Sequence, residues 1–291
     1  NIVGGDKWMG GVLAPNGNIY GIPSNSTKIL KIVPTSGTVS TIDMSDSSTS
    51  AYLANHADTY KYGAGVLAPN GKIYGIPYKA TNVFVFDTST EAVSTIPNTN
   101  DILTGNNKWK GGVLAPNGKI YCIPYNSEKI LVIDPNNDSL STIDVSSTIG
   151  SANKKYGRGV MGPSGKIYVM PGENTHILII DTTNDSVSTL GSGFNATYAN
   201  GILAPNGRIY SIPRTASNIL EVDVINQTVT TLFSGDSNIS GTSIKYAGGV
   251  LANNGKIYVI PYKADRVLEI DPKANGSFNS NIPLLPVFNK Y

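Results

Sequence analysis

Aromatic side chains recur six times along this 291-residue chain in one sequence setting, four residues before the start of the motif V-L-A-P-N-G-K-I-Y-x-I-P or a close variant of it. A flat ring flanked by hydrogen-bond donors can stack on the C–H face of a ligand while the polar groups contact its hydroxyls. The same ring can instead pack between neighbouring structural elements. Both interpretations stay open for the six candidate ligand-binding aromatics, which are Trp8, Tyr62, Trp109, Tyr156, Tyr198 and Tyr246.

A lysine directly precedes five of these aromatics, and Thr197 takes its place in the fifth copy. We interpret the lysines as solvated caps beside the rings, with direct ligand contact as the alternative. Six equivalent sites would gain avidity for a repetitive glycan even if each contact were weak. The five lysines are Lys7, Lys61, Lys108, Lys155 and Lys245.

The fourth and fifth copies depart from the others. Two residues before the first Val or Ile of the motif, the other four copies carry Gly or Ala, whereas these two carry Arg158 and Asn200. The fourth copy also has an unusual loop at 172–176, and the fifth places Arg214 directly after its I-P. We therefore predict Arg158 and Asn200 as ligand-binding residues and look for an asymmetric site between these two copies. Neutral sequence drift is the alternative.

Few residues of the chain are suited to catalysis. We expect its two histidines, His56 and His176, to be solvated polar residues, and its one cysteine, Cys122, to be packed. The sequence gives no basis for a Ser-His-Asp triad. It also contains no nucleophile-elbow motif, no Gly-rich phosphate-binding loop and no cluster of Cys and His residues with the spacing of metal ligands. We predict no catalytic residue, no metal site and no cofactor.

The repeat indicates which elements position these residues. Its copies lie 42 to 54 residues apart, and units of that length cannot bury a core alone and have to stack on their neighbours. In the third copy, 111–115, 119–123, 129–133 and 140–143 have the pattern of four strands separated by turn signals. The sequence thus predicts an all-β fold, a six-bladed β-propeller with four antiparallel strands per blade. We expect a single domain over 1–291, with repeat units at approximately 7–54, 55–101, 102–150, 151–192, 193–236 and 237–291.

Charged residues mark the predicted strand register. If the second and third strands of a copy are antiparallel, the residue that opens one strand faces the residue that closes the other. Five copies hold a Lys or Arg opposite an Asp at these positions, and the first copy lacks both, with Asn18 and Val33 instead. We interpret the aspartates as turn residues rather than metal ligands. The pairs are Lys72 with Asp87, Lys119 with Asp134, Lys166 with Asp181, Arg208 with Asp223, and Lys256 with Asp271.

The N-G-x-I-Y core and the closing I-D-P or I-D-T turn resemble those of six-bladed propellers of the NHL and YVTN-repeat type, from Trp8 to about Ile282. The resemblance implies that the first strand of each blade lines a central channel and that the repeated aromatics lie at its mouth. Lactonases and gluconolactonases of similar fold hold a metal there with Glu, Asn and Asp. The corresponding strands, such as 11–14 and 65–68, contribute no carboxylate or histidine, which argues against catalysis in the channel.

Composition narrows the expected partners. Charged residues make up 14% of the chain and the net charge is +2, which gives no reason to expect nucleic acid or an anionic membrane as a partner. No apolar stretch is long enough to insert into a membrane. The chain begins at Asn1 without a leader and carries several N-x-S/T sequons, so we expect an extracellular or cell-surface location.

These observations together predict a monomeric, non-enzymatic binding module whose partner is a glycan, contacted by shallow stacking and hydrogen bonds on one face. The first alternative is a protein-interaction or structural scaffold that uses the same face for another protein. The second is a propeller-type lactonase or hydrolase. We further expect the apolar tail at 283–288 to cover the seam between the first and last blades.

Overall fold

The structure is a computed structural model that describes residues 5–44, 60–98, 101–233, 239, 243–273 and, for the backbone, 277–283. The chain forms two compact units, unit 1 at residues 1–153 and unit 2 at residues 154–291. The single domain expected over 1–291 stays a prediction. The expected role of the tail falls at residues 284–288, which lie outside the described part of the chain.

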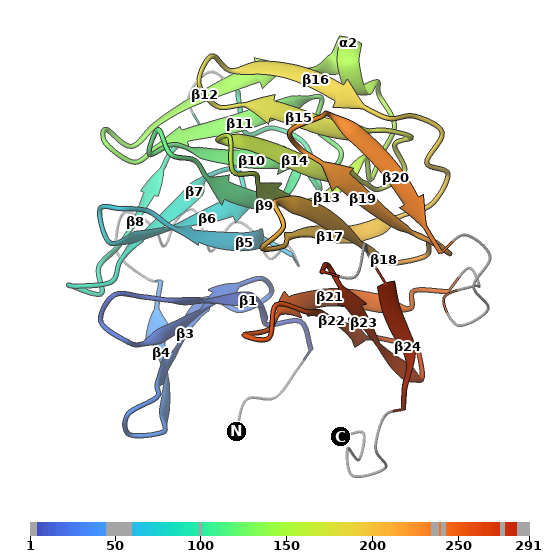
Figure 1. The fold of residues 1–291 in the computed structure, drawn as a ribbon. Helices are drawn as coiled ribbons and strands as arrows, with labels where there is room; N and C mark the ends of the chain where they lie inside the picture. The colour runs from blue at the N-terminus through green and yellow to red at the C-terminus, as the bar shows by residue number, and fades with distance from the viewer. Residues whose placement is uncertain are drawn as a thin grey trace. The chain divides into compact units, whose positions relative to one another are not determined.

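Each unit contains three antiparallel sheets of four strands, which we call blades 1 to 3 in unit 1 and blades 4 to 6 in unit 2 (Figure 1). Strand order within every sheet follows the sequence, as the repeat predicts, so the all-β class with four antiparallel strands per blade is confirmed. Unit 1 also has one helical turn, α2 (Ser146–Ile149).

The strands of unit 1 are β1 (Trp8–Leu13), β2 (Ile19–Pro23), β3 (Lys28–Val33) and β4 (Thr38–Asp43) in blade 1, β5 (Tyr62–Leu67), β6 (Lys72–Pro77), β7 (Val83–Asp87) and β8 (Val93–Ile96) in blade 2, and β9 (Trp109–Leu114), β10 (Ile120–Pro124), β11 (Lys129–Asp134) and β12 (Ser139–Asp144) in blade 3.

The strands of unit 2 are β13 (Tyr156–Met161), β14 (Lys166–Pro171), β15 (Ile177–Asp181) and β16 (Ser186–Leu190) in blade 4, β17 (Tyr198–Leu203), β18 (Arg208–Pro213), β19 (Ile219–Asp223) and β20 (Thr228–Leu232) in blade 5, and β21 (Tyr246–Leu251), β22 (Ile257–Pro261), β23 (Arg266–Asp271) and β24 (Ser277–Pro283) in blade 6. The fourth strand expected at 277–282 in the last copy is therefore present.

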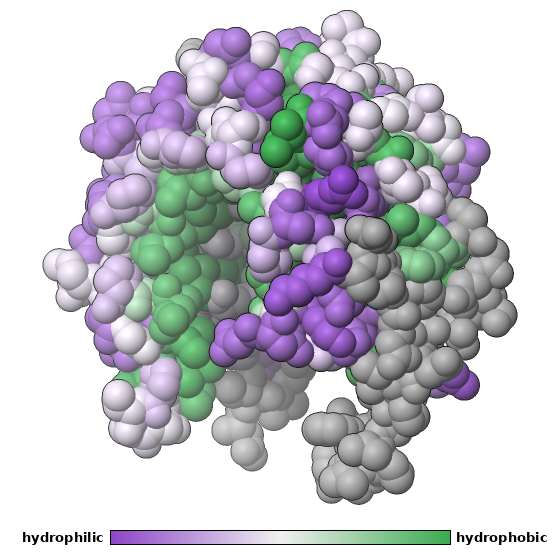
Figure 2. All heavy atoms as spheres, viewed as in Figure 1, coloured by the Kyte–Doolittle hydropathy of each residue, from purple (hydrophilic) through white to green (hydrophobic). Residues whose placement is uncertain are grey.

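The apolar core lies between neighbouring blades of a unit. In blades 2 to 5 the second and third strands are almost fully buried, whereas the first strands are only partly buried. In blades 1 and 6 the third strands are also only partly buried. Tyr20 of blade 1 and Phe86 of blade 2 meet edge to face with their ring centroids 4.8 Å apart. Leu13, at the end of β1, is 64% exposed. Figure 2 shows hydrophobic surface over the sheets of blades 1 and 2, bordered by hydrophilic side chains.

The asparagine of the P-N-G turn joins one blade to the next. The Oδ1 atom of Asn70 accepts a hydrogen bond from the Lys72 N–H at 3.0 Å, which shapes the turn. Its Nδ2 donates to the Tyr74 hydroxyl and to the Pro135 carbonyl of blade 3, both at 2.9 Å. Asn16 and Asn206 make the equivalent bonds to blades 2 and 6. We call this contact the asparagine tie, and it explains the spacing of Asn and Tyr in the repeat.

The predicted register of the charged pairs is confirmed where both residues lie within paired strands. Lys72, Lys166 and Arg208 face Asp87, Asp181 and Asp223 across the second and third strands. The ion pairs Lys166 with Asp181, Arg208 with Asp223, and Lys256 with Asp271 have N···O distances of 3.3, 3.3 and 3.8 Å.

Lys72 departs from the expected pairing, because its ammonium lies 3.3 Å from Asp138 of the next blade. The carboxylate of Asp87 instead accepts hydrogen bonds from the Ser89 hydroxyl and from the N–H groups of Ser89 and Thr90, and these bonds lower its pKa. This supports the turn role assigned to these aspartates.

Removing an asparagine tie should destabilise the fold without changing the strands. We expect Asn70→Ala to lower the free energy of unfolding by about 1–3 kcal/mol, because it deletes the bonds to Tyr74, Pro135 and Lys72. Urea denaturation measures the change. Asn253→Ala, at an exposed position of the equivalent turn in blade 6, is the matched control. Equal stability of the two variants would contradict the tie.

Candidate functional site

The repeated aromatics lie inside the blades. A β-bulge follows the aromatic in all six first strands, and such a bulge re-aims the neighbouring side chain. Trp109 is 1% exposed, and its indole N–H donates to the Lys129 carbonyl at 2.7 Å. Trp8 is partly buried and makes the same bond to Lys28 at 2.8 Å. The others, each at most 2% exposed, are Tyr62, Tyr156, Tyr198 and Tyr246.

This burial favours the packing interpretation of the six rings. The Tyr62 hydroxyl donates to Asn82, and the Tyr198 hydroxyl donates to Asn218. Burial also raises the pKa of both phenols. The five rings that are at most 2% exposed present almost no surface on which a ligand could stack, and the ligand-binding role of the six aromatics stays a prediction.

The expectation that the preceding lysines are solvated is wrong for four of the five, whereas Lys7 is half-buried. Lys61, Lys108, Lys155 and Lys245 are at most 5% exposed. The Lys108 ammonium donates to the carbonyls of Ala80, in the blade 2 loop, and Gly105 at 3.0 and 2.9 Å. The Lys245 ammonium likewise donates to the Thr215 carbonyl of the blade 5 loop at 3.1 Å. In blades 3 and 6, the repeat lysine therefore binds the loop of the preceding blade, a contact we call the lysine clamp.

Open aromatic surface is found instead on the loops that follow the second strands. In unit 1, a cavity of about 360 Å³ opens among the loops of blades 1 to 3. Gly63 allows the blade 2 and blade 3 strands to approach at this wall, since a Cβ there would clash with the Lys110 carbonyl oxygen at 2.8 Å. We call this space the tyrosine cavity, and it is lined by Met9, Tyr60, Tyr62, Gly63, Tyr78, Lys79, Asn107 and Lys110.

Half-buried tyrosines and lysines alternate around the tyrosine cavity. The Lys79 ammonium lies 5.9 Å from the centroid of the Tyr60 ring, and the Lys110 ammonium lies 5.0 Å from that of Tyr125. The rings of Tyr78 and Tyr125 are 5.6 Å apart and tilted by 48°. Burial, with Tyr125 nearby, raises the pKa of Tyr78 to about 12, so its hydroxyl remains a hydrogen-bond donor at neutral pH.

The backbone beneath these tyrosines is held by the residue that precedes the repeat aromatic. The Lys61 carbonyl accepts hydrogen bonds from the N–H groups of Tyr78, Lys79 and Ala80 at 2.9 to 3.1 Å. The Tyr78 carbonyl in turn accepts from the Lys108 N–H at 2.8 Å. The tyrosine cavity therefore has a fixed backbone frame.

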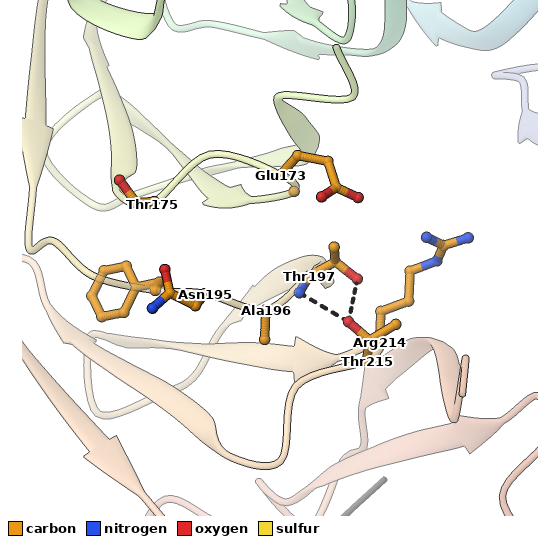
Figure 3. A pocket seen from close by; sticks show the side chains of 9 residues that line it. Glu173, Thr175, Asn195, Ala196, Thr197, Arg214 and Thr215 are labelled. Carbon is orange, nitrogen blue, oxygen red and sulfur yellow. Dashed lines mark hydrogen bonds between the residues drawn. The ribbon is translucent and has the colours of Figure 1, made fainter. Parts of the chain in front are cut away.

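Unit 2 has a different cavity between the loops of blades 4 and 5, where the sequence suggested an asymmetric site. Its volume is about 470 Å³. Figure 3 shows Glu173 and Arg214 on facing loops, with both charged groups on the same side of the cavity. We call it the Glu173–Arg214 cavity, and it is lined by Gly172, Glu173, Thr175, Phe194, Asn195, Ala196, Thr197, Arg214 and Thr215.

Arg158 and Asn200, which the sequence predicts as ligand-binding residues, lie at the bulges of the first strands and do not line this cavity. Arg158 is exposed on β13. Asn200 is half-buried on β17, and its Oδ1 atom is buried without a hydrogen-bond partner. Their role as ligand-binding residues stays a prediction. The sequence signal for Glu173 and Arg214 was present, because other copies place Lys or Tyr in these slots.

The remaining candidate residues have no arrangement for catalysis. Cys122 is fully buried. His176 is half-buried rather than solvated, beside the Tyr156 ring, and burial lowers its pKa. His56 lies outside the described residues. Within the described residues, no three His, Cys, Asp or Glu side chains are grouped so that they could hold a metal. The same part of the chain includes no helix with the length and apolar character to span a membrane.

Comparison with solved structures identifies the fold. Virginiamycin B lyase from Staphylococcus aureus superimposes with a TM-score of 0.72 at 10% identity, over 98% of this chain and 85% of that chain. The extracellular domain of BT3049 from B. thetaiotaomicron, assigned as a hybrid two-component system, gives 0.65 at 11% identity, over 95% of this chain and 35% of that chain. A protein from Bacteroides uniformis assigned as a 6-phosphogluconolactonase gives 0.59 at 14% identity, over 92% and 82%.

The sheets and these similarities define the chain as a six-bladed β-propeller. No protein-family model and no curated protein sequence matches it. At identities this low, the similar structures establish the fold and leave the activity open.

The lysine clamp should make stability depend on pH. Burial lowers the pKa of Lys108 to about 8 from its usual 10.5. Between these values the unfolded chain binds a proton that the folded chain has released, so the free energy of unfolding should rise with pH. The neutral amine keeps two N–H donors for its two carbonyl partners. We expect Lys108→Met to lack this rise, whereas Lys119→Met, at a half-exposed lysine, keeps it. Urea denaturation from neutral to alkaline pH measures it, and parallel curves for all three proteins would contradict the assignment.

Proposed function

We propose that this propeller is a non-enzymatic binding module and that its ligand is a carbohydrate, bound at the tyrosine cavity. The observation that carries the proposal is the grouping of Tyr60, Tyr78, Lys79 and Lys110 around one cavity in unit 1. This proposal places the stacking on the loop tyrosines Tyr60 and Tyr78, instead of on the six repeat aromatics expected from the sequence.

The chemistry of the lining suits a sugar. A pyranose has an apolar C–H face and a rim of hydroxyls, so it needs an aromatic ring beside several hydrogen-bond donors and acceptors. Tyr60 and Tyr78 provide the rings, and Lys79 and Asn107 provide polar groups at the same cavity. The Tyr60 backbone is fixed by the bond from its N–H to Asn25 Oδ1 at 2.6 Å, and its hydroxyl donates to Asp6 at 2.8 Å. A fixed ring loses little conformational entropy when it binds.

A protein partner is the alternative that a second observation favours. Exposed apolar side chains occur in both units, among them Leu13 at 64% and Ile225 at 82% exposure. Such side chains are common at sites of protein association when they form a patch. The lactonase alternative is supported only by the fold it shares with the Bacteroides uniformis protein.

An extracellular location belongs to the same proposal. The BT3049 domain with the same fold is itself an extracellular domain. A carbohydrate ligand at a cell surface agrees with this location, and a monomer is sufficient for binding.

Binding should depend on the loop tyrosines and not on tyrosine content in general. A glycan array first identifies a ligand, and calorimetry then measures its Kd. We expect Tyr78→Ala and Tyr60→Ala each to weaken binding by at least about tenfold, because each removes a stacking surface from the cavity. Tyr262→Ala is the matched control, since Tyr262 follows the same I-P in blade 6 but is 64% exposed and lies in unit 2.

Two outcomes would overturn the proposal. One is that no glycan binds at millimolar concentration. The other is that Tyr262→Ala weakens binding as much as Tyr78→Ala. Co-purification of one stoichiometric protein, lost on Leu13→Asp, would instead support the protein-partner alternative.

A further inference from the structure

The Glu173–Arg214 cavity lies where the repeat loses its lysine. In blades 3 and 6, the lysine before the repeat aromatic extends to the loop of the preceding blade and fills the space beside it. Blade 5 has Thr197 at this position, and the loop of the preceding blade provides Gly172, Glu173 and Thr175 to the cavity wall. The cavity is thus the space left by a missing lysine side chain. It is widened by neighbouring loop residues that differ from those of the other copies.

The short threonine is fixed away from that space. The Thr197 hydroxyl hydrogen-bonds the Thr215 hydroxyl at 2.8 Å, and the Thr197 N–H donates to the same oxygen at 3.1 Å (Figure 3). The Thr197 carbonyl accepts from the N–H groups of Arg214 and Thr215, both at 3.0 Å. These bonds hold the wall in place while leaving the cavity open.

In blade 3, the lysine clamp has a second acceptor just before the lysine in the chain, and the corresponding segment of blade 5 also lines this cavity. In blade 3, the Lys108 ammonium donates to the carbonyl of Gly105, three residues earlier in the chain. The residue three positions before Thr197 is Phe194, which lines the cavity. The two segments that surround the Lys108 ammonium in blade 3 are the loop of the preceding blade and the residues just before the lysine. The corresponding segments of blades 4 and 5 line this cavity, which makes it suited to an ammonium from a ligand.

Charged side chains at the opening fit the same ligand. The second residue after the I-P or M-P is acidic only in blade 4, where it is Glu173, so a negative charge lies beside the vacant space in this blade alone. The other copies have Asn25, Lys79, Asn126, Thr215 and Lys263 there. Arg214 occupies the slot of Tyr78 and Tyr262. Among the residues that the structure describes, neither Glu173 nor Arg214 forms an ion pair, although both line one cavity. Two opposite charges with no ion-pair partners favour a ligand that carries both signs.

We propose that the Glu173–Arg214 cavity binds a free α-amino acid. Its ammonium enters the space that the repeat lysine fills in blades 3 and 6 and pairs with Glu173, and its carboxylate is held by the guanidinium of Arg214. The volume of about 470 Å³ also leaves room for a side chain, beside the ring of Phe194. This site is separate from the tyrosine cavity and does not depend on the carbohydrate proposal.

The first experiment screens the twenty standard α-amino acids, each alone at millimolar concentration, by thermal shift of the full chain. Calorimetry follows for every amino acid that raises Tm, together with its N-acetyl and amide derivatives. We expect at least one free amino acid to bind and both of its blocked derivatives to bind at least about tenfold more weakly, because each derivative removes one of the two charges.

Thr197→Lys is the decisive variant. It restores the residue of the other five copies, and blades 3 and 6 show that the fold accommodates a lysine there. We expect the variant to fold and to lose amino acid binding, because the introduced side chain fills the space of the ligand ammonium. Its circular dichroism spectrum and its cooperative unfolding in urea should match those of the wild type, which confirms that the variant is folded.

Charge variants test the two ends of the ligand. Glu173→Gln and Arg214→Gln should each weaken binding by about tenfold or more. The matched controls are Glu128→Gln, at an exposed carboxylate in unit 1, and Lys263→Gln, at an exposed cationic side chain of unit 2 that does not line the cavity. The proposal fails if no amino acid shifts the Tm of the wild-type chain. It also fails if Thr197→Lys binds as tightly as the wild type, or if the blocked derivatives bind equally well.

Discussion

In blades 3 and 6, the lysine that precedes the repeat aromatic buries its ammonium between neighbouring blades, and the arrangement of the loops around it depends on this buried charge. An ammonium away from water has to find acceptors, because an unpaired buried charge is strongly destabilising. Lys108 and Lys245 find them in backbone carbonyls, including one from the preceding blade in each case. The requirement fixes the spacing of adjacent loops within a unit. The asparagine tie acts at the other end of the strands, where Asn70 reaches the Pro135 carbonyl.

The two cavities lie between loops whose residues differ from copy to copy around this fixed frame. The residue after the I-P motif is held by its backbone, so its side chain can vary without disturbing the blade. Where that residue is Tyr78, an aromatic cavity forms in unit 1, and where it is Arg214, a charged cavity forms in unit 2. Replacement of the clamp lysine by Thr197 opens the second cavity further. The repeat thus supplies a common backbone, and the loop side chains that vary on it give the two cavities their different chemistry.

The sequence was sufficient to predict the blades because strand positions follow from turn signals and alternating burial, and the copies repeat both. It also located the asymmetric cavity through Glu173 and Arg214, which replace residue types shared by other copies. It could not predict that the repeat aromatics are buried. The β-bulge that turns Trp109 inward is a register shift of one residue, which the pattern of side chains does not indicate. The burial of Lys108 was missed for a related reason. Its partners are backbone carbonyls, which have no signature in the side-chain sequence.

If the missing clamp lysine at Thr197 opens the charged cavity of unit 2, restoring that lysine should close it, and a crystal structure of the Thr197→Lys variant can show this. We expect the introduced ammonium to lie within hydrogen-bond distance of a backbone carbonyl in the blade 4 loop and the cavity beside Glu173 to close. If the introduced side chain instead extends into solvent and the cavity is unchanged, the missing lysine is not the origin of the cavity.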